Sequence, residues 1–105
     1  MKYAANIYGD IDVLVNNASV FPGRFSILKT TLDDWEKTIG INCRGSYFMT
    51  RQFIDFHINK RHFDKIRKVV FTASNSAINT YDDLYPLSKN FQVCFAQSIA
   101  QKYFK

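Results

Sequence analysis

The sequence predicts an α/β fold in which helices alternate with the strands of a parallel sheet. Two short apolar runs, 11–15 and 68–74, are rich in β-branched residues, which is typical of strands buried on both faces. Helical patterns lie before, between and after these runs, and this alternation is typical of parallel sheets. Because two strands leave sheet edges and apolar surface uncovered, we expect the chain to form part of a larger domain or to borrow surface from a partner.

Length and composition exclude several other classes of protein. A chain of 105 residues forms at most one domain, and a hydrophobic content of 47% excludes a disordered chain. The formal net charge of +5 raises the question of nucleic acid, but no known nucleic-acid-binding pattern accompanies the basic residues. Five of the 14 fall in one segment that is better explained as a solvated loop, namely Lys60, Arg61, Lys65, Arg67 and Lys68. We therefore expect no nucleic-acid partner.

The cysteines and histidines show no spacing that is typical of metal sites. Cys43 and Cys94 lie far apart in the sequence, while His57 and His62 accompany basic residues near the end of a predicted helix. Isolated cysteines of this kind are typical of reduced thiols in an intracellular protein. No apolar run approaches the length of a membrane span, and the N-terminus lacks a signal-peptide pattern. We therefore expect a cytoplasmic protein without a metal site and without a membrane partner.

The first segments of the chain predict a helix end, a strand and a loop. Residues 1–8 are typical of the end of a helix, which Gly9 and Asp10 would stop ahead of the strand 11–15. Small polar residues follow this strand, where the carboxyl edge of a sheet would begin. Residues 20–31 contain a Pro-Gly pair without helical or strand periodicity, and they predict a loop.

A long helical pattern follows and is interrupted near its middle. Thr31 or Asp33 can serve as its N-cap, and acidic side chains in the first turn complement the helix dipole. The pattern extends from Asp34 to about residue 62, but two glycines break its uniformity. We therefore expect a kinked or two-part helix with Asn42 near the break.

The last part of the chain predicts a second strand and a final helix. The strand 68–74 is followed by polar residues, and Asp82 or Asp83 can cap the helix with Pro86 in its first turn. Apolar residues then cover two faces of this helix. Such a pattern predicts that the helix buries more than one flank.

A phenol and an amine lie four residues apart at the start of the final helix. Because positions i and i+4 share one helix face, the Tyr85 hydroxyl and the Lys89 ammonium can share a small site. A free tyrosine titrates near ~10, and a fixed cation nearby favours its phenolate form. The pair is therefore a candidate general acid/base, although the same spacing also occurs in exposed pairs without chemistry.

Taken in their order, these segments resemble the short-chain dehydrogenase/reductase family. Residues 10–19 resemble its fourth strand with the Asn-Asn-Ala-Gly motif, here with Ser19 in place of the glycine. Residues 41–48 resemble the helix with the catalytic asparagine, residues 69–74 the fifth strand with the catalytic serine, and residues 85–89 the Tyr-x-x-x-Lys signature. The resemblance spans nearly the whole chain and implies a Rossmann-like doubly wound parallel sheet, present in part as two parallel strands with flanking helices.

The resemblance implies an oxidoreductase that uses NAD or NADP and transfers a hydride to or from a small carbonyl or alcohol substrate. Tyr85 would be the general acid/base, while Lys89 would favour its phenolate electrostatically and hold the nicotinamide ribose. Ser74 would hydrogen-bond the substrate oxygen, with the hydroxyl of Thr72 or Ser76 as the alternative.

Four further residues receive roles from the same resemblance. Asn42 would hold a water that links Lys89 to solvent, although it could also simply satisfy backbone groups at the helix break. Asn17, Ala18 and Ser19 would lie along the cofactor with Tyr85 and Lys89, at the sheet edge where such folds bind dinucleotides. Asn17 could also tie neighbouring strands together.

We expect residues 1–105 to be the central, catalytic portion of one such domain. The family's first βαβ unit with its Gly-rich phosphate turn has no counterpart here, nor has the C-terminal substrate segment. An alternative is a non-catalytic remnant or a helix-mediated assembly module. The family pattern also implies a homo-oligomer that associates through the helices around 45–60 and 86–104.

Overall fold

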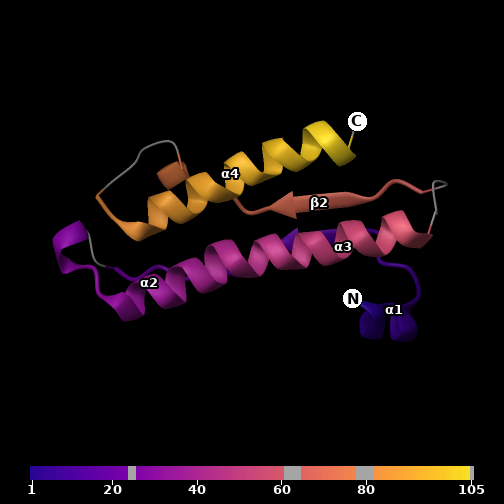
Figure 1. Cartoon of the computed structure of the whole chain (residues 1–105), viewed down its shortest axis with the longest axis horizontal. Coiled ribbons are helices and arrows are strands. Elements are labelled where there is room, and N and C mark those ends of the chain that lie inside the picture. Colours follow the sequence, from indigo (N-terminus) through magenta and orange to yellow (C-terminus); the bar gives the residue numbers. More distant parts are fainter. Residues whose placement is uncertain (24–25, 61–64, 78–81, 105) are drawn as a thin grey trace.

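The computed structural model describes residues 1–23, 26–60, 65–77 and 82–104. Its helices and strands are, in order, α1 (Lys2–Tyr8), β1 (Val13–Asn16), α2 (Leu32–Ile39), α3 (Ser46–Lys60), β2 (Lys68–Phe71) and α4 (Leu84–Tyr103). Short 3-10 turns occupy Ile27–Lys29 and Asn75–Ala77, and a π-helical turn occupies Gly40–Gly45. The molecule is elongated, 50 × 28 × 16 Å, and α2 and α3 form one long rod beside α4 (Figure 1).

The two strands form a parallel sheet, as the sequence predicts. They are direct neighbours, with Val13 opposite Lys68 at one end and Asn16 opposite Phe71 at the other. β1 begins later than predicted and ends one residue later, while β2 begins at residue 68 as predicted and ends earlier, because strand pairing lasts only where the two segments lie side by side. The expected fold class, a partial Rossmann-like sheet of two parallel strands with flanking helices, is confirmed.

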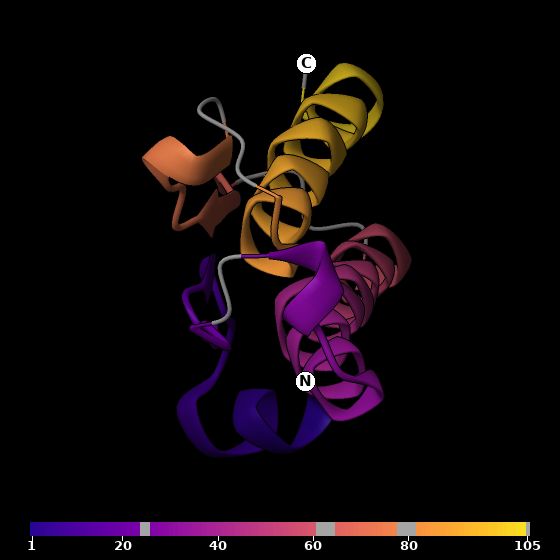
Figure 2. The same cartoon turned by 90° about the vertical axis from the view of Figure 1, so that its left-hand side faces the viewer.

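Helices cover one face of this sheet. Figure 2 shows α3 and α4 on the same side of the two strands. Burial alternates along both strands. Leu14 and Val69 are half-buried, whereas Val13, Val15 and Val70 are 47%, 57% and 44% exposed. The described residues therefore supply one layer of helices, and the opposite face presents a row of valines.

The N-terminal elements follow the predicted punctuation. Helix α1 ends at Tyr8, where Gly9 adopts a φ of 82°, a left-handed conformation that glycine tolerates best. Thr31 caps α2 through a reciprocal capping box: Asp34 N donates to Thr31 Oγ1 over 3.1 Å, and Thr31 N donates to Asp34 Oδ2 over 2.9 Å. Of the two predicted caps, Thr31 is therefore the one used.

The predicted break of the long helix is the π turn. It contains Asn42 and is bounded by Gly40 and Gly45, so the two-part helix predicted from the glycines is confirmed. Ser46 Oγ closes the turn by donating to the backbone oxygens of Asn42 and Cys43, over 3.0 and 3.1 Å. The predicted end of α3 near residue 62 lies outside the described residues.

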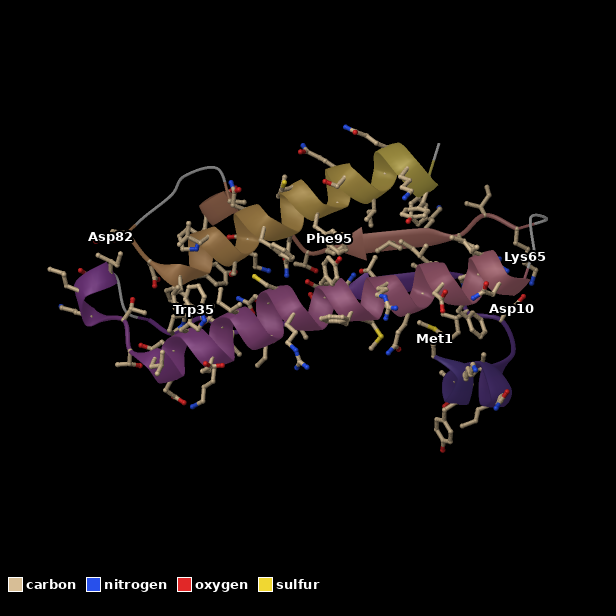
Figure 3. The ribbon with its side chains drawn as sticks, in the orientation of Figure 1. Met1, Asp10, Trp35, Lys65, Asp82 and Phe95 are labelled. Carbon is tan, nitrogen blue, oxygen red and sulfur yellow. The ribbon has the colours of Figure 1, made fainter. Side chains whose placement is uncertain are left out.

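The core between α3, α4 and the sheet is largely aromatic. Phe53 is 1% exposed. Phe95 of α4 is labelled near the middle of the molecule (Figure 3), and its ring stacks on that of Tyr47 of α3 at 4.8 Å between centroids. The rings of Phe71 and Phe91 each lie 5.8 Å from that of Phe95. These contacts fix the position of α4 relative to the carboxyl ends of the strands.

Helix α4 buries one of its two apolar flanks. Ile99 on one flank is 8% exposed, whereas Val93 and Tyr103 on the other are 36% and 44% exposed. The prediction that both flanks are buried is therefore wrong for the described residues. The side of α4 away from the sheet remains open.

The basic segment contributes a structural arginine. Arg67 donates from Nη1 to Asp12 over 2.7 Å, from Nη2 to Asp10 over 3.2 Å, and from Nε to His57 Nδ1 over 3.2 Å. Arg67 thereby links the segments that precede the two strands to helix α3. Arg61 and His62 lie outside the described residues. No described helix combines the length and apolarity that crossing a bilayer requires.

Candidate active site

The predicted site residues gather where the strands end and α4 begins. Asp83 caps α4, its Oδ1 accepting from Leu84 N over 2.7 Å, so Asp83 rather than Asp82 is the N-cap. Pro86 then occupies the first turn, where a missing N–H costs no hydrogen bond. This start of the helix sets Tyr85 at the edge of the sheet.

Tyr85 and Lys89 share one site, as their spacing predicts. The Lys89 Nζ lies 5.6 Å from the centroid of the Tyr85 ring. Lys89 is 3% exposed, and its Nζ donates to Thr72 O over 3.1 Å and to Gln92 Oε1 over 3.3 Å. Tyr85 is half-buried, with its ring edge-on to Phe21 at 5.1 Å. An ammonium buried beside a phenol is thus held by two oxygen acceptors.

Asn42 is a fully buried anchor of the site. Its Oδ1 accepts from Val20 N over 2.8 Å, and its Nδ2 donates to Val20 O over 2.9 Å and to Ser88 Oγ over 3.0 Å. Its backbone oxygen also accepts from Gln92 Nε2 over 2.7 Å. Asn42 therefore joins the loop after β1, the π turn and α4. This agrees with the alternative that Asn42 satisfies backbone groups at the helix break.

In the described residues, the Ser74 side chain does not join the hydrogen bonds that Lys89 makes with Thr72 and Gln92. It is half-buried after β2, and its Oγ accepts from Ser76 N over 3.2 Å, which shapes the 3-10 turn. The Thr72 hydroxyl, one of the alternatives to Ser74, instead donates to Asn17 Oδ1 over 2.8 Å. Because Ser74 Oγ is an acceptor in its described bond, its proton remains available to a substrate oxygen.

The three residues predicted along the cofactor lie at the carboxyl edge of β1. Asn17, Ala18 and Ser19 are exposed there. The bond from Thr72 shows that Asn17 ties the two strand ends together. In the described part of the chain, no group of three or more His, Cys, Asp or Glu side chains could hold a metal ion.

Two buried polar residues of the site are absent from the sequence-based prediction. Ser88 is 0% exposed and Gln92 is 2% exposed, and both bond to Asn42. Their positions give a signal that could have found them, because 88 and 92 follow 85 at i+3 and i+7. Polar residues at these spacings lie on the same helix face as Tyr85 and Lys89.

The fold and the site together define a Rossmann-type α/β protein with a Tyr-Lys pair at the carboxyl edge of its parallel strands. A family model described as short chain dehydrogenase matches residues 1–105. The chain therefore belongs to the short-chain dehydrogenase/reductase family.

Named relatives agree with this assignment. The chain is 31% identical over 102 residues to an uncharacterized oxidoreductase of Thermotoga maritima, a match that covers 95% of this chain and 38% of that protein. It is 32% identical over 99 residues to dehydrogenase/reductase SDR family member 4 of Oryctolagus cuniculus, covering 92% of this chain and 36% of that protein. The chain thus spans well under half the length of these relatives.

Solved structures show the same fold. A short chain dehydrogenase from Burkholderia cenocepacia in complex with NADP is 29% identical with a TM-score of 0.79, over 95% of this chain and 39% of that one. The 3-ketoacyl-(acyl-carrier-protein) reductase from Brucella melitensis, complexed with NADH, has a TM-score of 0.87 at 24% identity, over 96% of this chain and 42% of that one. At 24% identity, the second likeness shows the fold alone.

Proposed function

We propose that the protein is an NAD(P)-dependent oxidoreductase that interconverts a small carbonyl compound and its alcohol. The observation that carries this proposal is the 3% exposed Lys89, whose Nζ lies 5.6 Å from the centre of the Tyr85 ring. Burying an ammonium costs free energy unless it is well bonded. A role in proton chemistry with Tyr85 explains why the fold keeps the charge at this place.

The residues present fit the nicotinamide and ribose end of the cofactor. In the described part of the chain, hydrogen bonds to Thr72 and Gln92 use two of the three Lys89 ammonium protons, which leaves one for a ribose hydroxyl. Asn17, Ala18 and Ser19 form an exposed strip where folds of this type bind dinucleotides. When bound, the cofactor supplies or accepts the hydride.

The chain's own residues supply the proton and hold the substrate oxygen. In the direction of reduction, the Tyr85 hydroxyl donates its proton to the carbonyl oxygen, and in the reverse direction the phenolate accepts it. The Lys89 charge stabilises the phenolate that forms. Ser74 donates a hydrogen bond to the substrate oxygen, and Asn42 fixes the π turn against α4.

The proposal also places the protein in the cytoplasm. Cys94 is a free, exposed cysteine, and such thiols stay reduced in that compartment. The proposed partners are a small carbonyl or alcohol and the cofactor, without nucleic acid or membrane.

A comparison of two tyrosine variants tests the proposed chemistry. In the full-length protein, oxidation of NADH and NADPH is measured with a panel of aldehydes and ketones. We expect Tyr85→Phe to lower kcat by about 10²- to 10⁴-fold, because it removes the transferred proton while leaving the ring in place. Tyr8→Phe is the matched control, since Tyr8 is 81% exposed on α1. Equal activity of wild type and Tyr85→Phe would contradict the proposal.

A second candidate function, an assembly module, rests on the open groove between α3 and α4. This groove has a volume of about 310 Å³ and is lined by Tyr47, Arg51, Ile54, Asp55, Ile58, Phe95, Ile99 and Tyr103. Its occupant would be a second copy of the chain. Arg51 and Asp55 lie one turn apart on α3, so a two-fold arrangement can set each against its opposite in the other copy.

Sedimentation and cofactor titration separate the two candidates. Ile58→Glu puts a charge into the groove and is expected to convert a dimer to a monomer, whereas Leu28→Glu, at a side chain 93% exposed elsewhere, leaves the mass unchanged. An unchanged mass for Ile58→Glu would contradict association through this groove. Saturable binding of NADH or NADPH in a calorimetric titration would contradict a purely non-catalytic remnant.

A further inference from the structure

A buried glutamine connects the Lys89 ammonium to the backbone of the π turn. Gln92 Oε1 accepts from Lys89 Nζ over 3.3 Å, and Gln92 Nε2 donates to Asn42 O over 2.7 Å. Lys89, Gln92 and Asn42 are 3%, 2% and 0% exposed. On the side that faces the π turn, the lysine ammonium is thus in contact with a buried amide.

The Asn42 groups that point to this region are already engaged. The backbone oxygen accepts from both Gln92 Nε2 and Ser46 Oγ, over 2.7 and 3.0 Å. The side-chain amide bonds to Val20 and Ser88. In the described structure, Gln92 therefore joins Lys89 directly to the Asn42 backbone oxygen.

An amide and a water differ in what they do with a proton. A water can accept a proton from one neighbour and pass another on. The oxygen of a primary amide accepts a hydrogen bond, but its N–H groups are very weak acids, so the group holds a charge in place without relaying protons. The Gln92 amide can therefore position the Lys89 ammonium while isolating it from proton exchange on that side.

We propose that Gln92 is a positioning residue for Lys89. The Gln92 side-chain amide clamps the ammonium to the Asn42 carbonyl and closes the side of the site that faces the π turn to water. This inference rests on the proposed function for its meaning in the reaction. Protons that reach Tyr85 then come from the solvent-exposed side of the site and not from the side of Lys89 that faces the π turn. Gln92 lies on the same helix face as Tyr85 and Lys89, three residues after the lysine, which allows direct contact.

Hydrogen exchange tests the clamp without cofactor. Protein with ¹⁵N-labelled lysine and glutamine is used to measure the exchange of the Lys89 ammonium and Gln92 amide protons by NMR. We expect slow exchange in the wild type, and an acceleration of Lys89 exchange on the order of ten-fold in Gln92→Ala, which leaves space for a water. Gln92→Met keeps that space filled, and Gln97→Ala is a control on the exposed side of α4. Equal Lys89 exchange in wild type and Gln92→Ala would overturn the clamp.

Turnover by the full-length protein gives the second readout. Gln92→Met removes both hydrogen bonds and keeps the site dry, so we expect kcat to fall by about ten-fold with little change in KM for the carbonyl substrate. Gln92→Ala admits a water that can replace the bonds, and its kcat is expected to exceed that of Gln92→Met. A merely structural role predicts the reverse order, because the larger cavity is the more damaging one.

The two proposals fail in different ways. If the wild type shows no cofactor-dependent turnover, the proposed function is overturned, and slow Lys89 exchange that Gln92→Ala accelerates still supports the clamp. If Tyr85→Phe abolishes turnover but Gln92→Met is as active as wild type, the function is supported and the positioning role is overturned.

Discussion

The side-chain amide of Asn42 donates to Ser88 Oγ over 3.0 Å and joins two segments that lie 46 residues apart in the sequence. Ser88 Oγ in turn donates to Tyr85 O over 2.7 Å. Both Asn42 and Ser88 are 0% exposed. The π turn and the helical turn that carries Tyr85 are therefore one hydrogen-bonded unit.

The first prediction concerns the stability of this unit. Asn42→Ala removes the partner of the Val20 backbone N–H and C=O and one of the two hydrogen bonds of the buried Ser88 hydroxyl. We therefore expect the free energy of unfolding to fall by about 2–4 kcal/mol, and by about 1–2 kcal/mol for Ser88→Ala. In urea unfolding, the double variant should lose less than the sum of the two, because both remove the same bond. Ser98→Ala on the exposed side of α4 is the control. Strict additivity would contradict a direct coupling.

The second prediction concerns the two cysteines. Cys43 is buried beside Asn42, and burial raises the pKa of its thiol above the ordinary value of 9.0, whereas Cys94 is exposed. With a thiol-specific disulfide reagent at pH 8, we expect a fast phase from Cys94 and a slow phase from Cys43. Cys94→Ser should remove the fast phase alone. Two equal rates in the wild type would show that Cys43 is not protected.

The same thiol gives a sign for the pH dependence of stability. Because folding raises the pKa of Cys43, the folded state holds this proton more tightly than the unfolded state. The contribution of this thiol to the free energy of unfolding is fully present below the ordinary pKa of 9.0 and is lost as the pH rises through the pKa of the folded state. Between pH 8 and pH 10, the wild type should therefore lose more stability than Cys43→Ala. A larger loss in the variant would reverse the assigned direction.

The third prediction concerns Arg67, whose side chain is 9% exposed. Arg67→Met keeps the aliphatic length but leaves Asp10 and Asp12 without this cation, so we expect a loss of about 1–3 kcal/mol in urea unfolding, reduced because Asp12 is partly exposed. Lys37→Met is the matched control, since its ion pair with Asp33 is exposed and should contribute nothing measurable. Similar losses in both variants would argue against a structural role for the Arg67 cluster.

Local signals in the sequence predicted much of this architecture. The alternation of helices and strands, the Thr31 cap and the break at the glycines depend on neighbouring residues, and each is found in the structure. The proximity of Tyr85 to Lys89 follows from the helical repeat in the same way. Features that depend only on residues one or two helical turns apart could therefore be predicted from the sequence.

The long-range polar contacts were not readable in this way. The bond from Gln92 to the Asn42 backbone oxygen spans 50 residues, and it depends on how the π turn presents that oxygen to α4. No local pattern specifies such a contact, because it is set by the packing of two elements. The exposed flank of α4 was missed for a related reason, since periodicity shows which faces are apolar but not which are covered.

The last prediction concerns the hydrogen bond between Thr72 and Asn17 at the sheet edge. The Thr72 hydroxyl holds Asn17 Oδ1 at 2.8 Å, while its backbone oxygen separately accepts from Lys89. Thr72→Val removes only the hydroxyl, so Asn17 loses its fixed orientation and the lysine keeps its acceptor. We expect calorimetric titration of the full-length protein with NADPH to show an affinity loss of about three- to ten-fold, which corresponds to one ordinary hydrogen bond.

Thr72→Ser provides the matched control for this prediction because it retains the hydroxyl. It should bind the cofactor as the wild type does, and both variants should unfold within about 1 kcal/mol of the wild type because the bond is exposed to solvent. If the valine and serine variants bind NADPH with equal affinity, Asn17 ties the strands together without orienting the cofactor. A selective loss in the valine variant supports a direct part for this edge in cofactor binding, since the serine variant keeps the hydroxyl that orients Asn17 and the valine variant does not.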